Sequence, residues 1–278
     1  MFRLLAIASI ATCLVAPASA QSSPAPKPRS APPQASVNQQ TAPTLRARAS
    51  CDLGVIAAVG DEFQIKQISL SHWISEPSYV PISHWGLDDL VFERVRAAAG
   101  PRTIVQRIPY SKERFPPPKE TQNALFRDRE AELVEILRKI TSGTSCQRFV
   151  LVGRSISRFN GSVQTVRGIG IIDLDNPLRH RTYLYALSYI RVFDGRDFAI
   201  LKQGSAITER EPLLDRMVLG ETISGPFREV DNAAFPSNPA DAAHNLAFRE
   251  AVRAMLKSSL DRTLPSMLQP STTEASSR

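Results

Sequence analysis

Short apolar runs separated by turn residues dominate the chain after residue 50. Runs with strand character cover residues 53–59, 63–68, 103–108, 147–152, 166–174, 182–193 and 198–207. Apolar residues recur at helical spacing over about 87–99, over about 121–140 and in a closing stretch that begins at 238–239. We therefore expect an α/β (α+β) fold: a mixed β-sheet of about six to seven strands with about three helices packed on it, a C-terminal hairpin and a closing helix.

Several residues mark where these elements begin and end. Gly143 supplies a left-handed stop for the second helix, and Asp194–Gly195 is the strongest hairpin signal in the chain. Asn238 is a cap and Pro239 a first helical residue for the closing helix, which Pro265 is expected to follow. The predicted core face of that helix comprises Phe248, Val252, Met255, Leu256, Leu260 and Leu264, with Leu246 off the stripe.

The first 20 residues have the pattern of an export signal. Arg3 precedes a largely apolar run of 13 residues from Leu4 to Ala16, and Ala18-Ser19-Ala20 places small residues before a cleavage point near Ala20/Gln21. The run is too short to span about 30 Å of hydrocarbon as a stable helix. We therefore predict a periplasmic or extracellular protein with no transmembrane segment in the mature chain. In an alternative reading, Ile10 to Cys13 resembles a lipoprotein box and Cys13 is lipidated.

Composition divides the remainder into three parts. Residues 21–49 are rich in Pro, Ser, Ala and Gln and have almost no large apolar residue before Leu45, which predicts a disordered, Pro-rich linker. Residues 50–268 are expected to form a single globular α/β domain, and residues 269–278 a disordered tail. The linker is either a spacer that holds the domain away from an anchor or an end without a function.

The net charge of +7 does not indicate nucleic-acid binding. It comes from 34 basic and 27 acidic residues, of which residues 1–20 contribute +1 and residues 21–48 contribute +4. Everything from residue 49 onward therefore holds 29 basic and 27 acidic residues, which leaves +2. DNA binding needs clustered Lys and Arg on a folded surface, and no such run appears.

Two cysteines remain after removal of the signal, and both precede apolar runs. Cys51 precedes 53–59 and Cys146 precedes 149–152, so parallel pairing of these strands places both thiols at the same end. An even number of cysteines in an exported chain favours a disulfide. A reactive or metal-binding pair has less support, because the chain contains no CxxC motif and no neighbouring histidine.

The candidate ligand site is the loop after the strand that ends at Val152. It offers guanidinium, hydroxyl and amide groups beyond the carboxyl end of a predicted strand, where ligands gather in open α/β sheets. Such groups suit a carboxylate, a phosphate or a sugar hydroxyl. The candidate binding residues are Arg154, Ser155, Ser157, Arg158, Asn160 and Arg167. In the alternative reading this is an ordinary solvated loop.

Motifs of the common enzyme classes are missing. The chain has no GxSxG, HExxH, Walker or EF-hand sequence, and its four histidines lack metal-ligand spacing, so no cofactor and no metal site are predicted. Ser155 as a hydrolase nucleophile requires a base, and His180 is the only histidine in the C-terminal sheet region. Asp88 and Asp89 are paired carboxylates, but a position in the first turn of a helix explains them by the helix dipole.

Two strand faces leave a structural and a functional interpretation open. Gly168 and Gly170 form a smooth strip that either allows close packing or makes a ligand floor. Tyr183, Tyr185 and Tyr189 share a face with Leu187, which is either core or a protein-binding or sugar-binding surface.

These observations predict an exported bacterial, non-catalytic protein, an interaction or accessory module of the cell envelope. Its expected partner is an envelope protein or a polysaccharide, and the Pro-rich linker before a small α/β domain resembles bacterial cell-envelope accessory proteins in architecture only. Two alternatives remain: a binder of a small anionic or sugar ligand through residues 154–161, and a serine-dependent hydrolase.

Overall fold

The computed structural model describes residues 51–69, 76–111, 129–158, 165–176, 179–207 and 225–269. All of them belong to the second of two compact units of the chain, Arg46–Arg278. The signal peptide predicted over 1–20, the linker over 21–49, nearly all of the tail over 269–278 and the candidate residue Asn160 lie outside the described residues.

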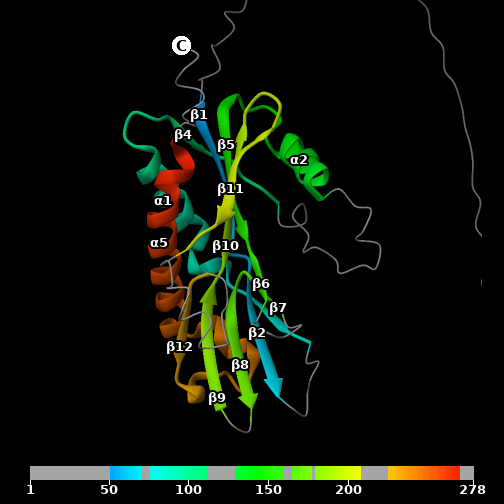
Figure 1. The fold of residues 1–278 in the computed structure, drawn as a ribbon, viewed down its shortest axis with the longest axis vertical. Helices are drawn as coiled ribbons and strands as arrows, with labels where there is room; N and C mark the ends of the chain where they lie inside the picture. Colours follow the sequence, from blue (N-terminus) through cyan, green and yellow to red (C-terminus); the bar gives the residue numbers. More distant parts are fainter. Residues whose placement is uncertain are drawn as a thin grey trace, which may run out of the picture. The chain divides into compact units, whose positions relative to one another are not determined.

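The described residues form twelve strands in three sheets (Figure 1). Sheet A has the order β11-β10-β5-β1-β4, with β1 at Cys51–Ala58, β4 at Val105–Arg107, β5 at Cys146–Arg154, β10 at Ser188–Asp194 and β11 at Ile200–Ser205. Sheet B has the order β12-β9-β8-β2-β3, with β2 at Glu62–Ser69, β3 at Ser78–Pro81, β8 at Ile169–Asn176, β9 at Arg179–Ala186 and β12 at Phe227–Val230. The pair β6-β7 comprises Ile156–Arg158 and Thr165–Arg167.

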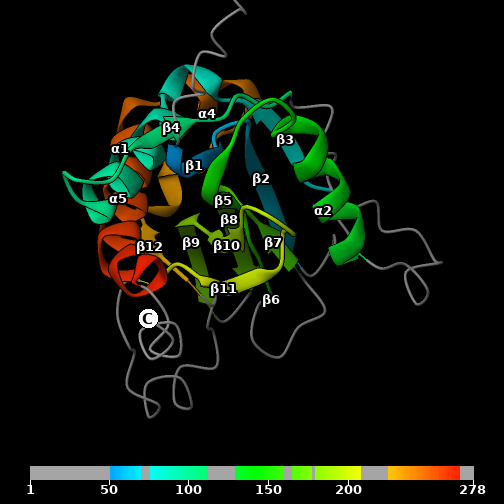
Figure 2. The same cartoon turned by 90° about the horizontal axis from the view of Figure 1, so that it is seen from above.

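Helices pack on these sheets as the α+β prediction requires, and the strands outnumber the six to seven expected. The described residues contain the α-helices α1 at Leu87–Ala99, α2 at Arg129–Ile140, α4 at Pro239–His244 and α5 at Leu246–Leu268, and the short 3₁₀ turns η1 at Ser83–Trp85 and η4 at Asn232–Ala234. Figure 2 shows α1 and α5 on one side of sheet A and α2 on the other. None of the described helices has both the length and the apolar character of a membrane span.

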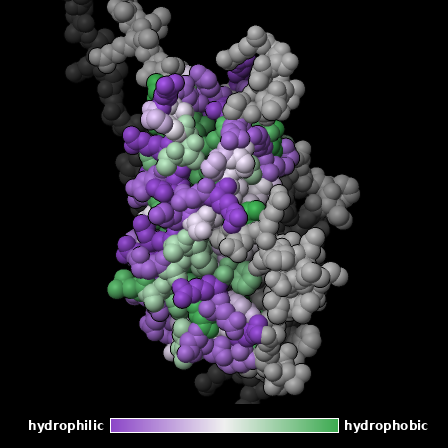
Figure 3. Space-filling model, turned by 60° about the vertical axis from the view of Figure 1, so that its left-hand side comes forward, coloured by the Kyte–Doolittle hydropathy of each residue, from purple (hydrophilic) through white to green (hydrophobic). Residues whose placement is uncertain are grey.

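Alternation along the central strands explains why sheet A is covered on both faces. Val55 of β1 and Val59, which directly follows β1, lie in the large core that α1 and α5 complete. Ile56 of β1 lies in a second core with Leu137 of α2. The predicted core face of the closing helix is confirmed for the five buried residues Phe248, Val252, Leu256, Leu260 and Leu264. The outer side of α1 and α5 is mainly hydrophilic (Figure 3), which is typical of amphipathic helices that cover a sheet.

The disulfide prediction is confirmed, together with its structural basis. β1 and β5 pair in parallel, and Cys51 stands directly opposite Cys146 in their register. The two cysteines form a disulfide, and both are buried. The bridge therefore joins the amino-terminal ends of two neighbouring core strands that are 95 residues apart in sequence.

Two predicted strands are broken, because successive parts of each pair with different neighbours. The strand expected at 182–193 divides at Leu187: β9 pairs with β8 in sheet B, and β10 pairs with β5 in sheet A. The strand expected at 166–174 divides at Gly168, whose φ of 59° lies in the left-handed region. Leu187 donates its N–H to the carbonyl of Gly168 at 2.7 Å, so the two breaks lie against each other.

Three other predictions need correction. No strand is predicted between 68 and 87, yet β3 lies there and pairs with β2. The closing helix is two helices, because Asn245 accepts a hydrogen bond from the N–H of Phe248 and caps α5 anew. Pro265 lies inside α5 and does not follow it. The helix continues there because the carbonyl of Pro265 still accepts from the N–H of Gln269, and Leu264 and Leu268 are buried.

Candidate functional site

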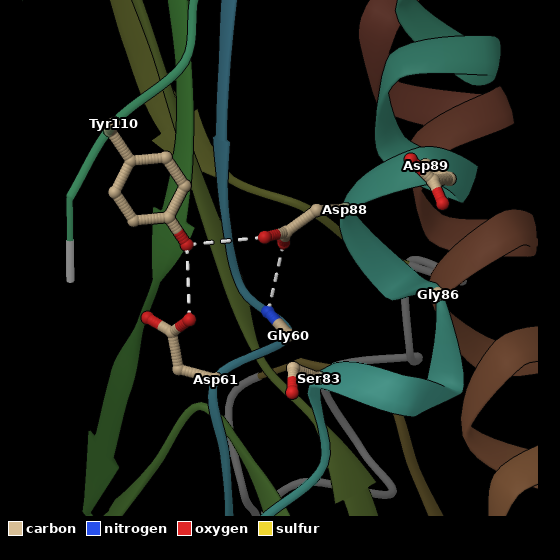
Figure 4. A pocket seen from close by; sticks show the side chains of 7 residues that line it. All are labelled: Gly60, Asp61, Ser83, Gly86, Asp88, Asp89 and Tyr110. Carbon is tan, nitrogen blue, oxygen red and sulfur yellow. Dashed lines mark hydrogen bonds between the residues drawn. The ribbon is translucent and has the colours of Figure 1, made fainter.

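A cavity of about 250 Å³ lies where β1 passes into β2, beside the start of α1. Its lining combines three carboxylates, a phenol and small residues: Gly60, Asp61, Ser83, Gly86, Asp88, Asp89 and Tyr110 (Figure 4). β1 and β4 run parallel in sheet A, and the cavity adjoins their carboxyl ends. Ligand sites of α/β sheets commonly occupy this end of the strands.

Three separate elements place the polar side chains of this cavity. Asp61 lies in the turn between β1 and β2, and Asp88 lies in the first turn of α1. Tyr110 follows β4 and is held in place because the N–H of Ile108 donates to the carbonyl of Val55 at 2.8 Å. Gly86 links η1 to α1 with a φ of 65°, a left-handed value that directs the chain from the 3₁₀ turn into the helix.

The Asp88 carboxylate joins α1 to the end of β1. Its Oδ1 accepts hydrogen bonds from the N–H groups of Val59 at 3.0 Å and Gly60 at 2.9 Å. Its Oδ2 lies 3.1 Å from the hydroxyl oxygen of Tyr110, which is also 3.2 Å from Oδ1 of Asp61. Figure 4 shows the phenol directed between the two carboxylates. The hydroxyl of Tyr110 thus bridges Asp61 and Asp88.

Burial raises the pKa of two residues of this cavity, Asp88 and Tyr110. Burial raises the pKa of Asp88 above its ordinary value, and the negative charge of Asp61 raises it further, while hydrogen bonds from Val59, Gly60 and Tyr110 oppose the rise. Burial also raises the pKa of Tyr110, as do the neighbouring charges of Asp88 and Asp61. The phenol therefore keeps its proton at neutral pH and acts as a donor.

The rim of the cavity is tied to neighbouring elements by two arginines. Arg107 of β4 forms an ion pair with Asp89. Arg253 of α5 donates from Nη1 to the carbonyl oxygens of Trp85 at 2.8 Å and Gly86 at 3.3 Å. Within the described ranges no group of three or more His, Cys, Asp or Glu side chains converges as a set of metal ligands.

The loop singled out from the sequence begins as a β-hairpin. β6 and β7 pair antiparallel, with Ile156 opposite Arg167 and Arg158 opposite Thr165. Ser155 and Ser157 are buried, and the backbone N–H of Arg167 donates to Oε1 of Gln64 at 2.9 Å. Arg158 is described by its backbone alone. Arg154, Ser155 and Arg167 are therefore close to the hairpin base, and the anion or sugar site stays a prediction.

The guanidinium of Arg154 forms an ion pair with another residue of the same domain. Its Nη1 lies 2.7 Å from Oε2 of Glu62, and its side chain is only 14% exposed. The aliphatic part of Arg154 covers Gly168, where an added Cβ would come within 2.9 Å of Cδ. This packing fits the structural interpretation of Gly168.

The serine hydrolase alternative loses its proposed base. The N–H of Ser155 donates to the carbonyl of Leu187, whereas His180 stands seven residues earlier in the same chain segment. At about 3.3 Å per strand residue this separates them by roughly 23 Å. Nε2 of His180 instead lies 2.8 Å from Oδ1 of Asp173, which also accepts from the hydroxyl of Thr182 at 2.7 Å. Ser155 and His180 do not form a catalytic pair.

Sequence reasoning misses the cavity residues. No pattern in the sequence marks Asp61 or Tyr110 as a candidate, and Asp88 has a sufficient local explanation in the dipole of its own helix. Asp61 and Asp88 are 27 residues apart, and Asp88 and Tyr110 are separated by 22. No motif spacing links them, because they meet only when the end of β1, the start of α1 and the segment after β4 pack together.

Comparisons with known proteins provide no family. No family model matches the chain, and no curated protein matches it. Among solved structures, the crystal structure of protein XCC0632 from Xanthomonas campestris, described with family model DUF330, covers 80% of this chain and 83% of its own chain. The sequence identity is 9% and the TM-score is 0.24, a similarity too small to carry an argument.

Proposed function

We propose that this protein is an exported, non-catalytic interaction module of the bacterial cell envelope. The observation that carries the proposal is the buried disulfide between Cys51 and Cys146. Disulfides of this structural kind persist in oxidising compartments such as the periplasm and are rare in the cytosol. The apolar run Leu4–Ala16 with its small-residue end provides the matching route out of the cytosol.

Two described histidines make contacts within the domain. The carboxylate of Asp173 accepts hydrogen bonds at both oxygens, since Nε2 of Gln67 lies 3.2 Å from Oδ2. Nε2 of His180 contacts the other oxygen of this carboxylate, and Nε2 of His84 lies 3.0 Å from the carbonyl of Ala243. Both histidine contacts hold structural elements together, and neither contact joins the histidine to a nucleophilic hydroxyl or thiol.

The partner is proposed to be an envelope protein or a polysaccharide recognised by the surface of the domain. Large apolar side chains are exposed at several separate positions: Tyr79, Ile104, Ile156, Leu201, Ile207 and Leu246. Singly scattered exposed apolar residues do not mark a docking surface by themselves. They do provide positions at which a bound partner would be within reach of a crosslinker.

The first experiment tests export. Intact cells that express the full chain are treated with a thiol-alkylating reagent, and the protein is then analysed by mass spectrometry without reduction. We expect a chain that begins near Gln21 and carries unalkylated, bridged Cys51 and Cys146. A cytosolic chain that retains residues 1–20 and carries alkylated Cys51 and Cys146 would overturn the proposal.

The second experiment tests recognition. A photo-crosslinking amino acid is placed at Leu201 or Leu246 and, as a matched control, at the exposed charged positions Glu250 and Lys257 of α5. We expect a discrete adduct from at least one apolar position in living cells and little from the controls. Adduct patterns that are the same at all positions would indicate random collision and contradict a specific partner.

A further inference from the structure

The cavity beside α1 places one hydroxyl between two carboxyl groups. A phenol has one hydrogen to donate, and an ionised carboxylate only accepts. Tyr110 nevertheless lies within hydrogen-bond distance of both Asp61 and Asp88. If both acids were ionised, one of these contacts would bring two oxygen atoms together without a hydrogen between them. The geometry is satisfied at both contacts when one of the two acids is protonated.

We propose that Asp61 and Asp88 share one additional proton through the hydroxyl of Tyr110, and that this proton ties the first turn of α1 to the bend between β1 and β2. The proton resides mainly on Oδ2 of Asp88. From there Asp88 donates to the oxygen of Tyr110, and Tyr110 donates to Oδ1 of Asp61. Oδ1 of Asp88 stays an acceptor for the N–H groups of Val59 and Gly60.

The surroundings of the two acids favour Asp88 as the protonated member. Burial is the largest cause of the raised pKa of Asp88, and the charge of Asp61 adds to it. Asp61 is also nearly buried, at 8% exposure, in the turn before β2. Both acids lie within hydrogen-bond distance of the same hydroxyl, so the charge of Asp61 acts on Asp88 at short range.

Among the described residues, four basic side chains on the elements beside the cavity contact other groups. Arg107 of β4 pairs with Asp89 on α1, and Arg154 of β5 pairs with Glu62 at the start of β2. Arg253 of α5 is held by the carbonyl oxygens of Trp85 and Gly86, and His84 of η1 contacts the carbonyl of Ala243. Tyr110 faces the pair from the segment after β4. The protonated acid completes the hydrogen-bond chain from Asp88 through Tyr110 to Asp61.

The shared proton makes this tie sensitive to pH. The pKa of Asp88 is higher in the folded chain than in the unfolded chain, so the stabilisation is complete below the ordinary Asp pKa. It is lost as the pH rises through the raised value of the folded protein. Between these two pH values, the loss of this one proton changes the unfolding equilibrium constant about tenfold per pH unit.

Asp88→Asn is the decisive variant, because an asparagine imitates a protonated aspartate. Its amide oxygen accepts from Val59 and Gly60, and its NH₂ group donates to Tyr110 at any pH. The unfolding equilibrium constant is measured by urea titration from pH 4 to pH 8 for the wild type, D88N, D88A and the control D89N. We expect the ratio of the wild-type unfolding constant to the D88N unfolding constant to rise with pH. The ratio of the D89N constant to the wild-type constant should change little over the same range.

Three results would overturn the proposal. One is a wild-type to D88N ratio that does not change with pH. Another is a D88N protein that is destabilised as much as D88A, which we expect to unfold about tenfold more readily than D88N. The third comes from carbon-13 NMR of the carboxyl groups in the wild type and D61N. We expect one carboxyl to titrate above the ordinary aspartate range in the wild type and lower in D61N, and a normal titration of every aspartate would exclude the shared proton.

Discussion

Tyr185 covers Gly170 on the neighbouring strand of sheet B. The two residues stand directly opposite each other in the register of β8 and β9. A Cβ at Gly170 would lie 2.3 Å from the hydroxyl oxygen of Tyr185 and 2.3 Å from the backbone oxygen of Gln64. The phenol is fully buried and donates to Oε1 of Gln64 at 2.6 Å. The absent side chain of Gly170 thus provides the space in which a buried polar contact between β2 and β9 forms.

Replacement of Gly170 by alanine is expected to destabilise the protein. The added methyl group would meet backbone as well as the tyrosine, so the strand itself has to shift, at a cost of about 3 kcal/mol. Gly153→Ala is the matched control, since a Cβ at Gly153 of β5 meets nothing within 4 Å. Urea unfolding of both variants checks this, and equal stability of the two would contradict the close packing at Gly170.

Removal of the Tyr185 hydroxyl tests the polar contact separately from the packing. Tyr185→Phe keeps the ring over Gly170 but takes one donor from Gln64, whose Oε1 also accepts from the N–H of Arg167. Because the phenol is deeply buried and its pKa is raised by that burial, the hydroxyl stays protonated as a donor throughout the neutral range. We expect a loss of about 1–2 kcal/mol of unfolding free energy.

Tyr189→Phe serves as the control for this change. Tyr189 is only half-buried in β10, and its ring stacks with the guanidinium of Arg191 at 4.5 Å, a contact that phenylalanine retains. Its substitution should change the unfolding free energy by less than about 0.5 kcal/mol. Unfolding of the two variants in guanidinium chloride provides the comparison. An equal loss of unfolding free energy in both would show that the Gln64 contact does not stabilise the fold.

Some parts of the fold could be predicted because they depend on residues that are close in sequence. Two cysteines in a chain with an export signal favour a bridge, and Cys51 and Cys146 each precede an apolar run. The structure adds the parallel pairing of these runs, which places the two residues opposite each other. The cap at Asn238 with Pro239 behind it is likewise readable, because a helix start depends on a few adjacent residues.

The breaks at Leu187 and Gly168 could not be predicted in the same way. Apolar residues continue through both positions, so periodicity indicates one strand in each case. The break arises from pairing with different partners, which is a property of the tertiary structure. The Asp61, Asp88 and Tyr110 cluster is of the same kind, because each residue alone has an ordinary local explanation and only the packing of three elements brings them together.

Loss of the disulfide should cost more than any of the single side-chain changes. The bridge closes 95 residues, and the loss of loop-closure entropy in the unfolded chain corresponds to about 4–5 kcal/mol. The double variant Cys51→Ala, Cys146→Ala should therefore melt at a lower temperature than the oxidised wild type. Its melting temperature should not respond to a reducing agent, whereas that of the wild type should fall. A wild-type protein unaffected by reductant under denaturing conditions would mean that the bridge adds no stability.

The indole of Trp85 anchors α4, and its replacement provides a local test of the architecture beside the cavity. Nε1 of Trp85 donates to the carbonyl of Ala243 at 2.8 Å, in the last turn of α4, where helix carbonyls lack partners within the helix. Trp85 is also fully buried, and its ring lies 5.4 Å from that of Phe63. Trp85→Phe keeps much of the apolar contact but leaves the carbonyl without this donor. We expect a loss of about 2 kcal/mol and faster hydrogen exchange confined to residues 239–245. Exchange that accelerates equally in α2, which packs on the opposite face of sheet A, would show that the effect is global and that Trp85 does not hold α4 specifically.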